Sequence, residues 1–159
     1  ARSEGLGRGS TFIVRLPLAD APAAEPADAA SRDRAAPSRR LRVLVVDDNA
    51  DTAWGLSRLL QLHGHDVAIA HDGPAAVASA RESRPDAVLL DIGLPGMTGY
   101  EVARKIREEP GCRDARLIAV TGYAQDKDRA RTREAGFDDH MAKPVDLDAL
   151  LAKLEEPRP

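Results

Sequence analysis

From residue 41 onward, short apolar runs alternate with segments of helical periodicity. The runs have strand composition and fall near residues 41–46, 66–70, 86–90, 116–120 and 138–142. The intervening segments repeat apolar residues with a helical spacing over residues 50–63, 74–83, 99–109, 125–135 and 146–155. Strands that alternate with helices form a parallel sheet with helices on both faces. We therefore expect an α/β fold with a doubly wound, five-stranded parallel sheet and five helices.

Composition limits what such a chain can do. Its 159 residues, 43% of them hydrophobic, suffice for about one domain with a core. The net charge of -3, without a basic stripe, argues against nucleic-acid binding. No apolar run approaches the ~20 residues that span a bilayer, so we expect no direct membrane contact. The single cysteine, Cys112, lies in a polar loop, has no disulfide partner and favours a reducing, cytoplasmic setting.

The first 40 residues differ from the rest. Residues 19–40 contain nine Ala, three Pro and no large apolar side chain, which is typical of a linker. Residues 11–16 have strand composition, and we expect no partner strand for them within this segment. We therefore interpret residues 1–18 as the severed end of a neighbouring domain and residues 41–156 as a complete domain. The chain starts with Ala rather than Met, so we expect it to be part of a longer protein.

Polar residues stand where the apolar runs end. Asp47 and Asp48 follow the first run, Asp91 ends the third, Thr121 follows the fourth and Lys143 the fifth. The carboxyl ends of parallel strands meet at one edge of the sheet, and a 2-1-3-4-5 order makes the first and third strands neighbours. Carboxylates gathered there repel one another, and a hard divalent cation such as Mg²⁺ relieves that repulsion. The pattern predicts a site for a divalent cation and a phosphoryl group.

The same residues suit phosphoryl transfer to a carboxylate. An ionised aspartate beside Mg²⁺ attacks phosphorus and forms an acyl phosphate without the help of a general base. Asp91 is the candidate nucleophile. The metal and Lys143 would neutralise the equatorial phosphoryl oxygens, and the Thr121 hydroxyl would donate a hydrogen bond to one of them.

Four separated motifs resemble one family. Residues 45–49, 89–99, 119–122 and 143–144 together resemble the receiver domain of two-component response regulators, in the order found in that family. The resemblance covers about residues 41–156. It implies a flavodoxin-like receiver fold that accepts a phosphoryl group from a phosphohistidine donor domain and passes it to a histidine phosphotransfer protein.

The resemblance also implies roles for individual residues. Asp91 would be the phosphoacceptor, Asp48 a direct ligand of Mg²⁺ (or Mn²⁺), and Asp47 a ligand that acts largely through water. Gly93, two residues after the acceptor, would lend its carbonyl oxygen to the metal. Thr121 would be the switch hydroxyl that moves toward the phosphoryl group.

Lys143 completes this set, and one position departs from the family pattern. Lys143 would pair with the phosphoryl group, and in this family the peptide bond to Pro144 is often cis. Three residues before Lys143, the family often has a Tyr or Phe whose inward rotation reports phosphorylation. This chain has His140 there, so a rotating aromatic ring is in doubt, although an imidazole could still swing inward or respond to pH.

The start of the chain carries a second, shorter resemblance. Residues 5–17 resemble the tail of a histidine-kinase ATP-binding domain, which implies a hybrid sensor histidine kinase with a C-terminal receiver as the parent protein. That tail alone cannot bind ATP. The chain therefore contains no kinase core, and its own chemistry would be self-catalysed phosphotransfer to Asp91 and autodephosphorylation. We expect this part to be cytoplasmic even where the parent is membrane-anchored.

Two other functions compete with this interpretation. A receiver-like binding module that regulates the attached kinase would act by contacts alone, but such modules typically lose an acid or the lysine, and this chain keeps them all. An aspartyl-phosphate phosphohydrolase would need a second Asp two residues after the nucleophile, where this chain has Gly93.

Several residues have a simple structural alternative. Asp47, Asp48 and Asn49 could simply cap the helix that follows, since Asp and Asn are preferred N-caps. The neighbouring His63, His65 and His71 hint at a metal site, but no Cys or acid completes the set. Trp54 lies off the apolar stripe of the helix at 50–63. It is an anchor for the histidine donor, a contact with the upstream kinase domain, or a lone surface aromatic.

Overall fold

The computed structural model describes residues 2–3, 5, 8–11, 13–14, 39–122 and 131–156. The chain divides into two units, Ala1–Asp33 and Arg34–Pro159. In the first unit, β1 (Arg2–Ser3) pairs antiparallel with β2 (Ser10–Thr11). The expectation of an unpaired strand over residues 11–16 was therefore wrong: the strand is shorter, and the chain just before it supplies a partner.

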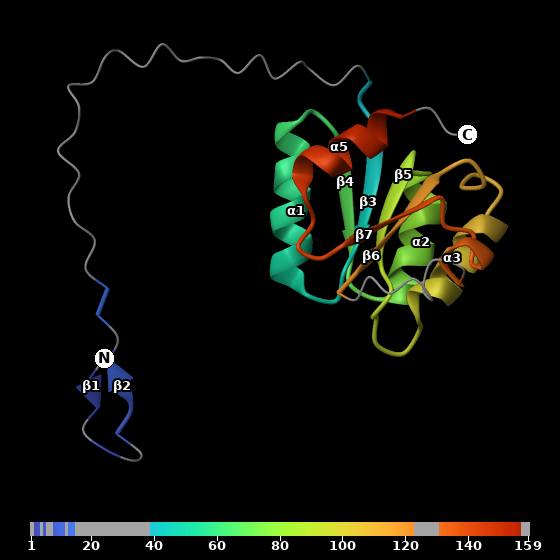
Figure 1. Cartoon of the computed structure of the whole chain (residues 1–159). Coiled ribbons are helices and arrows are strands. Elements are labelled where there is room, and N and C mark those ends of the chain that lie inside the picture. The colour runs from blue at the N-terminus through green and yellow to red at the C-terminus, as the bar shows by residue number, and fades with distance from the viewer. Residues whose placement is uncertain are drawn as a thin grey trace, which may run out of the picture. The chain divides into compact units, whose positions relative to one another are not determined.

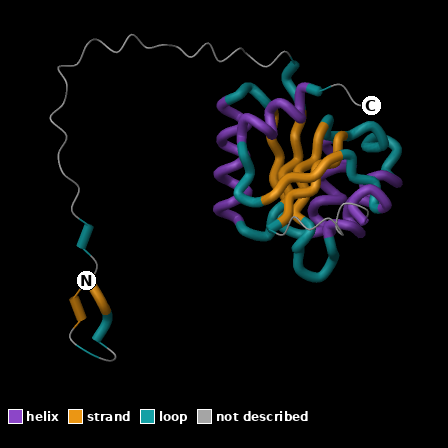
Figure 2. Tube along the Cα trace, viewed as in Figure 1, coloured by secondary structure: helices purple, strands orange, loops and turns teal. Residues whose placement is uncertain are grey.

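The second unit contains a five-stranded, all-parallel sheet in the order β4-β3-β5-β6-β7 (Figures 1 and 2). Its strands are β3 (Arg42–Val46), β4 (Asp66–Ala70), β5 (Ala87–Asp91), β6 (Arg116–Thr121) and β7 (Asp139–Ala142). In chain order this is the 2-1-3-4-5 arrangement. The predicted doubly wound sheet is confirmed, because each apolar run became a strand.

Helices cover both faces of the sheet (Figure 1). They are α1 (Ala50–Leu62), α2 (Gly73–Ser83), α3 (Gly99–Glu108) and α5 (Leu147–Glu155). Of the helix expected at 125–135, residues 131–134 are helical and residues 125–130 lie outside the described part. Among the described helices, none is both long and apolar enough to cross a membrane.

Alternate side chains of β3, β4, β5 and β6 enter two separate cores. On one face, Leu44, Val88 and Leu117 pack with residues of α2 and α3. On the other face, residues of the same strands such as Val45 and Leu89 pack with α1 and α5. This division follows from the period of two in a strand. Because apolar side chains and helices cover both faces of the sheet, polar functional groups are found at the ends of the strands.

Cys112 belongs to the core rather than to a polar loop. Its side chain is fully buried, and its thiol donates to the Ala80 carbonyl at 3.2 Å. Burial raises the pKa of the Cys112 thiol above its ordinary value. The sequence surroundings are polar because the loop's other side chains face solvent, and they concealed this inward position.

An ion cluster joins the last strand to α5. The Asp139 carboxylate accepts from the Arg116 guanidinium at 2.7 and 3.1 Å and from the Lys153 ammonium at 2.7 Å. Burial by itself raises the pKa of Asp139, but the hydrogen bonds from Lys153 and Arg116 outweigh it, so the pKa lies below its ordinary value. The charged form of Asp139 is therefore the one that stabilises the folded state.

We expect Asp139→Asn to lower the free energy of unfolding by about 1–2 kcal/mol at pH 7, since it leaves two cations with a weaker acceptor. A depressed pKa contributes stability above the unfolded-state value of about 4 and loses it as the pH falls through the folded-state value. The difference between variant and wild type in urea unfolding should thus shrink on acidification. Glu82→Gln, at an exposed acid of α2, is the control; an equal loss there would contradict the assignment.

Candidate functional site

Four strand ends bring polar residues together at one edge of the sheet. Asp91 is the last residue of β5, and Thr121 is the last residue of β6. Asp47 and Lys143 directly follow β3 and β7. Carboxylate oxygens of Asp47, Asp48 and Asp91 lie within 4.8 Å of one another. The convergence expected from a parallel sheet is present in the structure.

Lys143 connects two of these acids. Its ammonium donates to Asp91 Oδ2 at 2.6 Å and to Asp47 Oδ2 at 2.8 Å. Burial by itself lowers the pKa of Lys143, but its hydrogen bonds to Asp47 and Asp91 and their charges outweigh this and raise the pKa above its ordinary value. Lys143 therefore stays protonated at neutral pH. The bond from Lys143 to Pro144 is cis.

The Asp91 carboxylate is buried and held on both oxygens. Oδ2 accepts from Lys143, and Oδ1 accepts from the backbone N–H of Gly93 at 2.9 Å. The loop after Asp91 is kept tight by Gly99, because a Cβ at that position would lie 2.7 Å from the Ile92 Cα and closer still to the Asp91 backbone. Gly99 directly follows Thr98, the N-cap of α3.

Asp47 and Asp48 differ in their surroundings. Asp47 is buried, and its Oδ1 accepts from the backbone N–H of Asn49 at 2.9 Å. Asp48 is exposed, and its carboxylate accepts no hydrogen bond from the described residues. The helix cap is Asn49, whose side chain accepts from the Thr52 N–H at 3.0 Å. Neither acid is needed as the cap, and the carboxylate of Asp48 is left available to a ligand.

Thr121 is tied to the site through its backbone. The Lys143 N–H donates to the Thr121 carbonyl at 2.8 Å, one step beyond the register pair of Thr121 with Ala142. His140 is half-buried on β7, three residues before Lys143. No hydrogen bond or ion pair links His140 to the three acids within the described ranges. The predicted residues thus lie at the same edge of the sheet, except His140, which lies within β7, away from its carboxyl end.

Each of the three neighbouring histidines, His63, His65 and His71, contacts a backbone group. His65 is buried, and its Nδ1 accepts from the Leu41 N–H at 3.4 Å. Burial, then the nearby His63, lowers the pKa of His65, which suits a neutral acceptor. Among the described residues, the group that could hold a metal ion consists of Asp47, Asp48 and Asp91.

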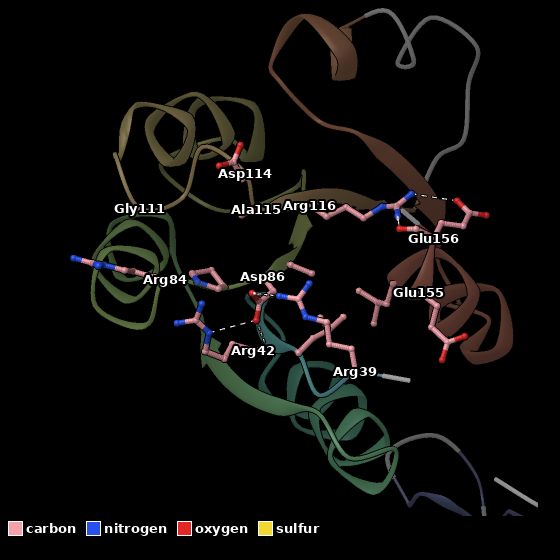
Figure 3. A pocket seen from close by; sticks show the side chains of 14 residues that line it. Arg39, Arg42, Arg84, Asp86, Gly111, Asp114, Ala115, Arg116, Glu155 and Glu156 are labelled. Atoms are coloured by element: carbon pink, nitrogen blue, oxygen red, sulfur yellow. Dashed lines mark hydrogen bonds and ion pairs between the residues drawn. The ribbon is translucent and has the colours of Figure 1, made fainter. Parts of the chain in front are cut away.

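A hollow lies at the opposite end of the strands (Figure 3). Its volume is about 410 Å³, and its walls include Arg42, Ala87 and Arg116, the first residues of β3, β5 and β6. Asp86 at its centre accepts from the Arg42 backbone at 2.8 Å and from the Arg42 side chain at 3.3 Å. Burial opposes this, yet the Arg42 bonds hold the pKa of Asp86 below its usual value. Asp86 is therefore paired with a cation, unlike Asp48 at the other end of the strands.

Fold and acidic site together define a receiver domain, and the comparisons agree. The sequence model of the response regulator receiver domain matches residues 43–155. The chain belongs to the response regulator receiver family. Protein PilH of Pseudomonas aeruginosa is 36% identical over 110 residues, which span 69% of this chain and 91% of PilH.

Two sensor proteins are also similar. The virulence sensor protein BvgS of Bordetella bronchiseptica is 38% identical over 159 residues, which span 96% of this chain and 13% of BvgS. The receiver domain of sensor histidine kinase PA1611 from Pseudomonas aeruginosa superposes with a TM-score of 0.67 at 34% identity. This match covers 74% of this chain and 96% of that domain, whose structure has a magnesium ion coordinated in the active site cleft.

We expect Asp48→Asn to raise the free energy of unfolding in the absence of divalent cations, by about 0.5–1 kcal/mol. The substitution removes an unpaired negative charge beside two buried carboxylates and so relieves repulsion. Urea unfolding in EDTA measures the change. Asp51→Asn, at an exposed acid in the first turn of α1, is the control, and a loss of stability in Asp48→Asn would contradict the expected repulsion.

Proposed function

We propose that this domain takes a phosphoryl group from a phosphohistidine onto Asp91 in the presence of Mg²⁺. The observation that carries the proposal is the Lys143 bridge between Asp47 and Asp91, with Asp48 unpaired beside them. One ammonium compensates only one of three carboxylates. A divalent cation would compensate the other two.

The donor set fits magnesium. Mg²⁺ prefers oxygen ligands, binds through one or two carboxylates and keeps several waters. Asp48 and Asp91 would bind it directly, Asp47 largely through water, and the Gly93 carbonyl would complete the protein ligands. Mn²⁺ would bind the same set. When bound, the cation neutralises negative charge on the phosphoryl group during transfer.

The transfer itself is a displacement at phosphorus. An oxygen of Asp91 attacks, an O–P bond forms, and the P–N bond to the donor histidine breaks, with its electron pair remaining on the imidazole nitrogen. Lys143 already contacts Asp91 at 2.6 Å. Its ammonium would therefore move only a short distance to pair with the phosphoryl group on Asp91. The Thr121 hydroxyl would donate to a phosphoryl oxygen, and His140 would be the residue on β7 that reports the change.

We expect wild-type protein incubated with acetyl phosphate and Mg²⁺ to gain the mass of one phosphoryl group, and Asp91→Asn to gain none. The reason is that the amide of Asn is not a nucleophile, although it has nearly the same shape. Intact-mass spectrometry measures the gain, with Asp47 and Asp48 intact in both proteins. Beryllofluoride, which mimics a phosphoryl group, should shift amide resonances around Asp91 only when Mg²⁺ is present.

The same experiment separates the competing functions. A receiver-like binding module would show no Mg²⁺-dependent change in mass or in its spectrum, and this outcome would overturn the proposal. An aspartyl-phosphate phosphohydrolase would turn over phosphate monoesters steadily. Gly93 offers no general acid at the position that such an enzyme requires, so we expect no steady turnover.

We propose a hybrid sensor histidine kinase as the parent protein. The division would be a kinase-domain tail at 1–18, a linker at 19–40 and the receiver at 41–156. In support, the similarity to the sensor protein BvgS spans 96% of this chain, more than the receiver alone. The receiver would work in the cytoplasm and exchange phosphoryl groups with the donor domain of its kinase and with a histidine phosphotransfer protein.

Helix α1 provides a surface for that donor. Trp54, Leu62 and Leu59 expose 64%, 61% and 42% of their area, although they belong to a helix that packs on the sheet. From this helix the core takes Ala53 and Leu60. Exposed apolar side chains, and an exposed Trp above all, are typical of a protein-binding surface. We propose that it contacts the helices that carry the donor histidine.

We expect Trp54→Ala to weaken binding of a phosphohistidine donor domain by at least about tenfold, since buried Trp anchors carry ~2 kcal/mol or more. The rate of phosphorylation by acetyl phosphate, which needs no protein docking, should stay unchanged. Stopped-flow transfer at increasing donor concentration measures the affinity for the donor, and intact-mass spectrometry over time measures the rate with acetyl phosphate. Arg104→Ala, at an exposed residue of α3, is the control. Unchanged donor affinity in Trp54→Ala would refute the docking surface.

A further inference from the structure

His71, the first residue after β4, contacts the acidic site through the backbone of Asp47. Its Nδ1 lies 3.1 Å from the Asp47 carbonyl oxygen. A carbonyl oxygen only accepts hydrogen bonds, so Nδ1 must carry the proton and donate. The imidazole ring is otherwise exposed. This contact therefore selects one tautomer and fixes one side of the ring to the end of β3.

With this bond, every polar group of Asp47 has a partner. Its N–H donates to the Ala70 carbonyl at 3.2 Å, and its carbonyl accepts from His71. Its two carboxylate oxygens accept from Asn49 and Lys143. Because the carbonyl belongs to the peptide that joins Asp47 to Asp48, the plane of that peptide is held from the β4 side.

Asp48 depends on this support. Its carboxylate accepts no hydrogen bond from the described residues, so side-chain contacts do not aim it at the site. Its direction comes from the backbone on either side. After Asp48, the Asn49 cap fixes the start of α1. Before Asp48, the hydrogen bond from His71 fixes the peptide.

We propose that His71 is a positioning residue: its Nδ1–H holds the Asp47–Asp48 peptide so that the Asp48 carboxylate faces the divalent cation. The inference rests on the proposed function of the site, since it assigns Asp48 to the metal. His71 itself touches neither the metal nor the phosphoryl group. Groups that orient ligands in this way are needed for tight metal binding.

Two substitutions distinguish the hydrogen bond from the mere presence of a side chain. The amide nitrogen of Asn occupies nearly the same place relative to the backbone as His Nδ1, so His71→Asn keeps the donor. The amide of Gln reaches one bond farther, to the place of Nε2, so His71→Gln moves the donor away. Both variants are polar and uncharged at an exposed position, and thermal unfolding verifies that both fold.

The first measurement uses no metal. The Asp48 amide belongs to the peptide whose carbonyl accepts from His71, so its ¹⁵N and ¹H shifts report that hydrogen bond. In EDTA we expect the Asp48 amide resonance to move in His71→Gln and to stay near the wild-type position in His71→Asn. Equal displacement in both variants would overturn the proposal.

The second measurement is titration of each protein with magnesium chloride in an isothermal titration calorimeter. We expect the Kd for Mg²⁺ to rise about fivefold in His71→Gln, the effect of losing one hydrogen bond, and to change less than about twofold in His71→Asn. Equal affinity in all three proteins would overturn the role of His71 and leave the proposed function intact. Failure of the wild type to bind Mg²⁺ would overturn both.

Discussion

The crowding of three carboxylates at one end of a dry sheet is the constraint on which the rest of the site depends. Asp47 and Asp91 are buried, so their charges require a partner, and Lys143 supplies it with bonds of 2.8 and 2.6 Å. Lys143 reaches both acids because parallel pairing brings the ends of β3, β5 and β7 to the same edge. The order of the strands therefore serves two purposes: it packs the core, and it brings the Lys143 cation to the two buried acids. Two negative charges remain uncompensated, which matches the charge of one divalent cation.

The remaining contacts divide into those that hold the acids and those that leave one of them free. Backbone N–H groups of Gly93 and Asn49 fix the carboxylates of Asp91 and Asp47. Asp48 has no such partner among the described residues. Its negative charge repels the two neighbouring carboxylates, and this repulsion lowers the stability of the folded state. A site that satisfied all three acids internally would be more stable, but it would offer a cation little. The unpaired acid is the feature that makes the site receptive.

The sequence predicts the fold and most of the site for one reason: in a parallel sheet, position along a strand determines position at the edge. Asp47, Asp48, Asp91, Thr121 and Lys143 all stand at strand ends, so their convergence follows from topology alone. Contacts between distant segments are not predictable in this way. Cys112 lies in a polar stretch but enters the core, and His71 reaches Asp47 across 24 positions. The hairpin of β1 and β2 was missed because strands of two residues carry no periodicity.

The hollow opposite the acidic edge has a consequence for how receivers are built into larger proteins. Arg39, where the described part of this unit begins, and Glu156, where it ends, both line that hollow. Arg39 and Glu156 thus lie at one pole of the domain, and the acids occupy the other. A domain fused at either residue would not have to cover the acidic edge. Such a domain can be fused to other proteins while its acidic edge stays accessible to binding partners.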